Sequence, residues 1–262
     1  MSGRVVTSSS IAATSREVAQ AEARDRRVRV WRTWWVQAHL YLGLTAGALL
    51  VVFGVTGSIL VFFQEIDEWL NPALLTVDAP ADGQNGYRPI GEILRAAEQA
   101  AAPGSRITQV YGATTHERVM AVYMEQASKA WQRIFVDPYR ARVTGVRSYG
   151  PDEWVPDYLM DAIFALHYQL FAGVTGVTLA AIAAWLLMLS LVTGVIVWWP
   201  VNGQWRHAFV IRRPFASFRL LFDLHKTLSL YLCLVIGAVL LSGAYMNWAE
   251  PIIWITQLLS PA

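Results

Sequence analysis

The sequence predicts a membrane α-helical protein: three transmembrane helices, with a small α+β domain inserted between helices 1 and 2 on the extracytoplasmic side. The composition is the first reason, because 55% of the 262 residues are hydrophobic and only 15% are charged, against about a quarter in soluble domains. The second is that three apolar runs are each long enough to cross a hydrocarbon core of about 30 Å. The third is that a mixed polar stretch, residues 65–160, separates the first run from the second.

The composition of residues 1–30 predicts a disordered amino-terminal tail that becomes basic towards its end. Its first part is rich in Ser and Ala and shows no periodicity. Five arginines lie close to the first apolar run: Arg24, Arg26, Arg27, Arg29 and Arg32. Basic residues beside a transmembrane helix favour the cytoplasmic side, so we expect the N-terminus in the cytoplasm and the first helix to run outward.

The first transmembrane helix is expected at residues 31–64, where no residue between Val36 and Phe63 is charged. His39, Gly43 and Gly47 are four residues apart and therefore share one face of this helix. An ionisable residue within an apolar span is by default a candidate functional residue, and it needs a partner. The two glycines leave room beside the imidazole for a flat ligand.

Residues 65–160 predict the α+β domain. An amphipathic helix is expected over residues 89–102, because apolar positions there recur with a helical period. The alternating stretch 107–124 predicts a hairpin, and two further strands are expected at 131–136 and 142–147. Because the first helix runs outward, this domain is placed on the extracytoplasmic side.

The second apolar segment, residues 161–200, is longer than one perpendicular span requires. Its outer end is therefore expected to project above the lipid or to bend at Gly173 and Gly176. The loop that follows, residues 201–222, is basic, which again indicates the cytoplasmic side.

The third transmembrane helix is expected at residues 223–248 and returns outward, leaving a short extracytoplasmic tail at 249–262. The expected location is the bacterial inner (cytoplasmic) membrane. Its N-terminus would lie in the cytoplasm and its C-terminus in the periplasm.

Two of the five histidines are expected at the same depth near the inner membrane surface: His39 in the first helix and His225 in the third. Imidazoles on two such helices can reach one ion from opposite sides, as a b-type haem with two axial histidines requires. A zinc or copper site is an alternative, but it lacks third and fourth ligands at this depth. The structural alternative is that both histidines are interfacial residues and that the glycines serve helix packing alone.

His167 is expected at the outer end of the second segment, about 46 Å from the inner end if the segment is fully helical. It is too far away to join the inner pair, but it could hold a second haem near the outer surface. Its partner there could be Met246, His116 or a residue of another subunit. His116, in a predicted turn, and His207, in the basic loop, are interpreted as solvated surface residues.

Several classes of function lack support in the sequence. The net charge of +2 gives no indication of a nucleic-acid partner. The single cysteine, Cys233, excludes a disulfide framework and a cysteine-based metal cluster within the chain. No phosphate-binding loop, dinucleotide-binding glycine motif or nucleophile triad is present. The chain therefore shows no nicotinamide or flavin site of its own. If it carries haem, the electrons that reduce the haem would have to come from a quinol or from a reductase partner.

Several stretches together resemble the PepSY-associated transmembrane family, in a short form with three helices. They are "HLYLGLTAGALLVVFGVTGSILVFFQEID", "RIFVDPYRARVTGVR", "ALHYQLFAG" leading to "LVTGVIVWWP", and "DLHKTLSLY". The family includes inner-membrane ferrisiderophore reductases that carry haem on transmembrane histidines and have PepSY-type outer domains. His39, His167 and His225 stand at the matching motif positions, so the resemblance implies that they hold haem iron. It also implies a PepSY-like fold for residues 65–160.

Longer members of the family add a second outer domain and a fourth transmembrane helix, for which this sequence has no counterpart after Trp248. The second ligand of an outer haem is therefore left open. A homodimer or a larger complex is one way to supply it. The resemblance thus implies one haem b and allows two.

The resulting hypothesis is a haem b-containing inner-membrane electron-transfer protein that passes electrons across the membrane to an outer-side acceptor such as a ferric siderophore. It would then be a candidate ferric reductase. Two alternatives stay open: a cytochrome b-like membrane-anchor subunit of a dehydrogenase complex, and a non-redox, membrane-anchored PepSY binding or inhibitory module. The expected partners are membrane lipid, a quinol or reductase donor, and an outer-side substrate or redox partner.

Overall fold

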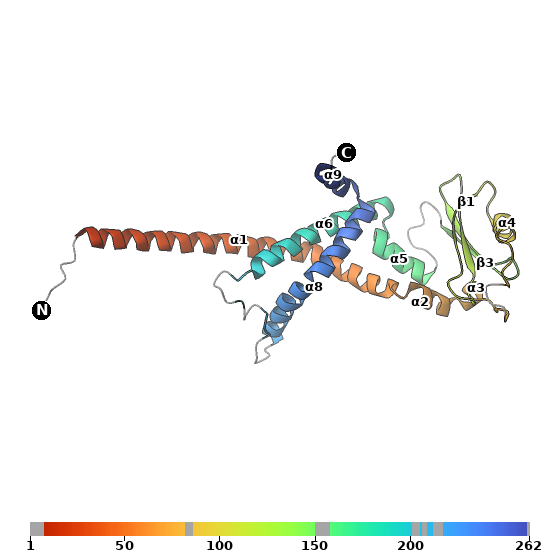
Figure 1. Cartoon of the computed structure of the whole chain (residues 1–262), viewed down its shortest axis with the longest axis horizontal. Helices are drawn as coiled ribbons and strands as arrows, with labels where there is room; N and C mark the ends of the chain where they lie inside the picture. Colours follow the sequence, from red (N-terminus) through yellow and green to blue (C-terminus); the bar gives the residue numbers. More distant parts are fainter. Residues whose placement is uncertain are drawn as a thin grey trace. The chain divides into compact units, whose positions relative to one another are not determined.

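A computed structural model of the chain forms two compact units, one of residues 1–51 with 178–262 and one of residues 52–177. The structure describes residues 8–81, 86–149, 158–200, 205, 209–211 and 217–260. Figure 1 labels the helices and strands along the chain. Each unit is described by itself below.

Among the described residues, three helices are long and apolar enough to cross a membrane. They are α1 (Ser8–Leu60, with the candidate span Arg26–Leu60), α6 (Gly173–Trp198) and α8 (Ser217–Asn247, with the candidate span Phe218–Asn247). The three helical spans predicted from the apolar runs are therefore confirmed. Their side chains are largely exposed, as expected where lipid rather than protein surrounds a helix.

The two ends of the chain differ from the expectation. The helix α1 already begins at Ser8, so the region expected to be a disordered tail is helical from that residue onwards. The reason is that the segment from Ser8 to Val30 contains no Gly or Pro and is rich in Ala, Arg, Glu and Gln, which favour a helix. The expected short tail at the other end contains a further helix, α9 (Glu250–Leu259), with Pro251 in its first turn.

The α+β domain predicted between the first two spans is present in the second unit. Its antiparallel sheet has the order β1-β2-β3-β4, formed by Arg106–Tyr111, Met120–Glu125, Trp131–Asp137 and Arg142–Tyr149. The helix α4 (Ile90–Ala100) contacts β3 and β4 and lies against one face of the sheet (Figure 1). The predicted helix and both predicted strand pairs are therefore confirmed. The extracytoplasmic placement of the domain stays a prediction.

The two faces of the sheet have different roles, because side chains alternate along a strand. On β2, Val122 and Met124 belong to the buried core that includes α4. Ala121 and Tyr123, which alternate with them along the strand, point to the opposite face, where α2 (Phe63–Leu70) and α5 (Leu159–Gln169) lie. A short helix, α3 (Pro72–Leu75), contacts β4 on the sheet as well. This second face carries the polar residues discussed below.

A sharp corner separates α5 from α6, where the sequence predicted a bend. Leu170, Phe171 and Gly173 have positive φ angles of 51°, 55° and 54°, which end the first helix and start the next. Gly176 lies so close to the preceding helix that a β-carbon there would overlap the carbonyl oxygen of Gln169. Only glycine permits this approach, so Gly176 helps to fix the corner.

Candidate functional site

The first unit brings His39 of α1 and His225 of α8 together, as the sequence predicted. Their ring centroids are 6.3 Å apart, and the ring planes are inclined at 43° to each other. A metal–nitrogen bond to imidazole is about 2 Å long, and the ring centre lies about 1 Å beyond the nitrogen. Two imidazoles on opposite sides of one metal ion should therefore have centroids about 6 Å apart, and this pair has that spacing.

The orientation of His39 is set by α6. Its Nδ1 lies 3.1 Å from the carbonyl oxygen of Ser190 and 3.1 Å from the hydroxyl oxygen of Thr193. A carbonyl can only accept, so Nδ1 carries the proton and donates it to Ser190. The other ring nitrogen, Nε2, then keeps its lone pair. A histidine held in this way through Nδ1 is prepared to bind a metal through Nε2.

A glycine of α6 makes room for the imidazole of His39. A β-carbon at Gly194 would lie only 3.0 Å from Cε1 of His39. β-carbons at Gly43 and Gly47 of α1 would meet nothing within 4 Å, so these glycines do not pack against the imidazole, and their role beside a flat ligand stays a prediction. Neither of these two glycines lines the cavity beside His39. The close packing therefore comes from Gly194, a residue that the sequence did not indicate.

A cavity of about 440 Å³ lies beside the two histidines, and we call it the two-histidine cavity. Most of its lining is aliphatic, including Leu187, Leu191 and Leu230. Two cations, Arg32 and Lys226, also line it, and the ammonium group of Lys226 lies 3.2 Å from Asp223. Haem b is a flat, largely apolar ring with two carboxylate groups, so both parts of this lining suit it. In the described part of the chain, no three His, Cys, Asp or Glu side chains come together. A haem needs only two axial ligands, because its ring supplies the other four.

His167 of α5, in the second unit, is held in a similar way. Its Nδ1 lies 2.9 Å from the hydroxyl oxygen of Thr56, whose own proton is donated to the carbonyl of Val52 at 2.7 Å. Thr56 can therefore accept the Nδ1 proton, which leaves Nε2 with its lone pair. A β-carbon at Gly57 would lie 3.1 Å from Cε1 of His167. His167 and His39 are thus each supported by a Thr-Gly pair.

His116 is exposed in the connection between β1 and β2, where its backbone carbonyl accepts a hydrogen bond from Tyr139. This agrees with its interpretation as a surface residue. Met246, a predicted candidate for the second outer ligand, has 79% of its surface exposed. His207 lies outside the described residues.

A repeated tripeptide could have identified these supporting residues from the sequence. Val-Thr-Gly occurs at residues 55–57, 143–145, 174–176 and 192–194. In each copy the glycine packs so closely that a β-carbon would displace a neighbour: His167, Leu74, Gln169 and His39, respectively. The repeat therefore indicates close-packing positions, two of which hold the predicted histidines.

The packing of Gly194 against His39 leads to a testable prediction. In the Gly194→Val variant, the added side chain should push the imidazole out of line with His225, and the bound haem per protein should fall at least severalfold. The matched control is Gly243→Val in α8, whose side chain would also enter open space and which has no predicted part in the site. Haem content measured on both purified variants checks this, and equal content in the two would contradict it.

A buried ion network in the second unit ties α5, which carries His167, to α2 and the sheet. Arg147 of β4, with a side chain only 1% exposed, donates to both carboxylate oxygens of Asp67 and to Asp161, each at 2.8 Å. The hydroxyl of Tyr149 also donates to Asp161 at 2.8 Å. Burial raises the pKa of Tyr149, so this hydroxyl keeps its proton and remains a donor. The network fixes the start of α5, six residues before His167.

A family model described as the PepSY-associated TM region matches residues 36–262. This match includes His39, His167 and His225. No curated protein matches the sequence at a significant level.

Proposed function

This chain belongs to the PepSY-associated transmembrane family, and on that premise we propose that it holds haem b between His39 and His225 and transfers electrons across the membrane. The observation that carries the proposal is the histidine pair, with ring centroids 6.3 Å apart. Bound haem would supply a one-electron carrier, because its iron alternates between the ferric and ferrous states.

The residues around the pair would each have a distinct role. Ser190 and Thr193 would fix the imidazole of His39 through Nδ1, which leaves the lone pair of Nε2 available to bind the iron. Arg32 and Lys226 would bind the carboxylates of the haem, because carboxylates in a site with little water prefer cationic partners. The aliphatic lining would exclude water and favour the uncharged ring.

The wider scheme has a second haem on His167 and an acceptor on the outer side. The support is that Thr56 and Gly57 hold His167 as Thr193 and Gly194 hold His39. A ferric siderophore is the acceptor that the family resemblance favours. The N-terminus would then lie in the cytoplasm and the sheet domain in the periplasm.

The test is a reduced-minus-oxidised visible spectrum of the detergent-purified full chain, with the haem quantified as its pyridine complex. We expect a sharp b-type α-band and at least one haem per chain. If His167 holds a second haem, the His167→Ala variant should lose one of two haems. A protein that stays colourless after haem is supplied would contradict the proposal and leave the non-redox PepSY module.

The acceptor is tested separately on the reduced protein. Mixing it anaerobically with a ferric hydroxamate chelate should reoxidise the haem, with ferrous iron formed in equal amount. Haem that is present but not reoxidised would favour the anchor subunit of a dehydrogenase complex. This result would leave haem binding intact while excluding the ferric chelate as acceptor.

A further inference from the structure

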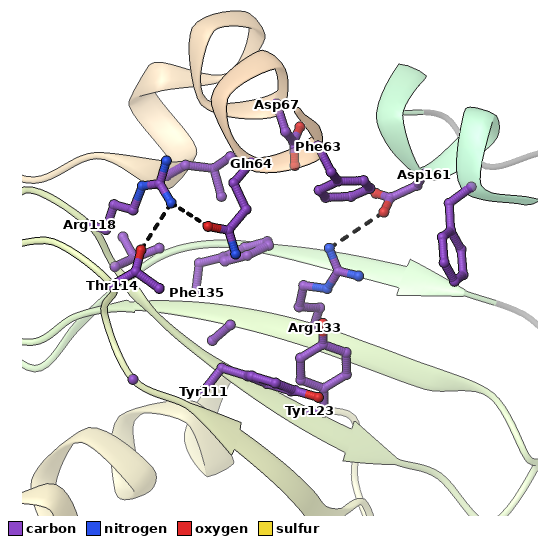
Figure 2. Close-up of a pocket in the computed structure, with 15 residues that line it drawn as sticks. Phe63, Gln64, Asp67, Tyr111, Thr114, Arg118, Tyr123, Arg133, Phe135 and Asp161 are labelled. Atoms are coloured by element: carbon purple, nitrogen blue, oxygen red, sulfur yellow. Dashed lines mark hydrogen bonds and ion pairs between the residues drawn. The ribbon is translucent and has the colours of Figure 1, made fainter. Parts of the chain in front are cut away.

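A second cavity lies in the unit of residues 52–177, on the sheet face opposite α4, and we call it the sheet-face cavity. Its volume is about 450 Å³, within the range of about 300–1,000 Å³ that is usual for small-molecule sites. The helices α2 and α5 border it on one side and strands of the sheet on the other, as Figure 2 shows. The proposed haem sites do not use it.

Five of the fifteen residues that line the sheet-face cavity are aromatic. Rings come both from the helices and from the strands: Phe63, Phe164, Tyr111, Tyr123 and Phe135. Aromatic walls of this kind favour a flat ring as ligand, because offset or edge contacts between rings add to the burial of apolar surface. The lining therefore suits a ring compound better than an extended polar chain.

One side chain in the cavity keeps unused hydrogen-bonding capacity. The Arg133 side chain is only 14% exposed, and its nearest carboxylate oxygen, on Asp161, is 3.4 Å away, at the long end for an ion pair. Its Nε is buried and has no hydrogen-bond partner among the described residues. Figure 2 shows the guanidinium pointing up from the sheet towards Asp161, above the ring of Tyr123. A ligand oxygen at this place would give Arg133 a further acceptor besides the distant carboxylate of Asp161.

The other arginine of the cavity is already fully engaged. Arg118 donates to Glu68, to Gln64 at 2.6 Å and to Thr114 at 3.0 Å. It therefore shapes one end of the cavity, while Arg133 at the other end remains the group that would recognise a ligand.

The charges around the cavity balance. Three arginines face three carboxylates as the pairs Arg118–Glu68, Arg147–Asp67 and Arg133–Asp161. Burial also raises the pKa of Tyr123, so this hydroxyl stays neutral. A site without net charge favours an uncharged ligand, because a buried charge without a partner is costly.

The cavity also lies next to the predicted membrane surface. Phe63 and Gln64, which line it, are the last residues of the uncharged run that begins in α1. We therefore propose that the sheet-face cavity binds the head ring of a lipid-borne quinone or quinol, with Arg133 donating to a ring oxygen. In the quinol form, a ring hydroxyl would donate to Asp161. Six helical residues, about 9 Å, separate Asp161 from His167 along α5, so the quinone would lie near the second proposed haem site.

The proposal is tested by calorimetric titration of the detergent-purified full chain with ubiquinone-1, against a blank titration into the same micelles. We expect saturable binding that weakens at least tenfold in Arg133→Gln. It should weaken similarly in Ala121→Leu, which fills the cavity and leaves the ion pairs in place. The control is Arg106→Gln, an exposed arginine of the same sheet that pairs with Glu125 outside the cavity. Thermal unfolding of each variant confirms that it is folded.

Three outcomes would overturn the proposal. They are no saturable binding to the wild type, equal binding by wild type and Ala121→Leu, or stronger Arg133-dependent binding of ferrichrome, a neutral ferric chelate, than of ubiquinone-1. Stronger binding of ferrichrome would indicate that the cavity holds the ferric electron acceptor and not a quinone. The titration measures quinone binding and does not depend on haem. A colourless protein that still binds ubiquinone-1 would therefore refute the proposed haem function but support the quinone site.

Discussion

The His225→Ala and His39→Ala variants are each expected to lose the b-type α-band of the inner haem. Each variant removes one of the two imidazoles that face each other at 6.3 Å, and a low-spin b-type haem needs both. The measurement is the reduced-minus-oxidised spectrum with haem quantitation on the purified proteins. If the chain holds one haem, the band should disappear; if it holds two, half of it should remain.

The control for this experiment is His116→Ala. His116 is exposed on a turn of the sheet domain, so its loss should leave the spectrum unchanged. An α-band of full height in His225→Ala would show that His225 is not an axial ligand. The haem would then have to be sought on His167 alone or between subunits.

The Arg147→Met variant is expected to destabilise the sheet domain by about 3–5 kcal/mol. The methionine would leave Asp67 and Asp161 buried without the guanidinium that joins them. Removing one partner of a buried ion network costs much more than an exposed pair contributes, because the remaining charges stay desolvated. Thermal unfolding and the protease resistance of residues 52–177 in the purified chain would measure the loss.

Two further variants make this prediction specific. Arg106→Met removes an exposed partner of Glu125 and should leave the unfolding temperature unchanged. The triple variant Arg147→Met, Asp67→Asn, Asp161→Asn removes the charges together and should recover part of the lost stability. A triple variant no more stable than Arg147→Met would show that packing, and not charge, accounts for the effect.

Much of the helical architecture could be predicted because the membrane imposes a simple rule. A chain that crosses lipid must satisfy its own backbone hydrogen bonds over about 20 apolar residues, and such runs are visible in composition alone. The sheet could be predicted in a similar way, because the side chains of β2 alternate between its two faces from Met120 to Glu125. The helical start at Ser8 differs from the expected disordered tail. That segment is rich in Ser and Ala and shows no apolar periodicity, but its residues have a high helix propensity.

The residues that contact the histidines could not be predicted from local sequence patterns. His39 and Thr193 are 154 residues apart in the chain, and no periodicity within either helix indicates that they meet. The glycines of α1 lay on the same face as His39, but the residue packed against the imidazole is Gly194 of α6. Which small residue accommodates a ring depends on which helices are neighbours, and that is a tertiary property.

The sequence by itself determined the family, the three apolar helices, the α+β domain and the three candidate histidines, because each leaves a local mark in composition, period or motif. Only the tertiary structure decided which groups face one another: His39 with His225, Thr56 with His167, and Arg147 with Asp67, which is 80 residues away. The physical reason is that burial and hydrogen bonding act between atoms close in space, and the folded chain alone brings these atoms together.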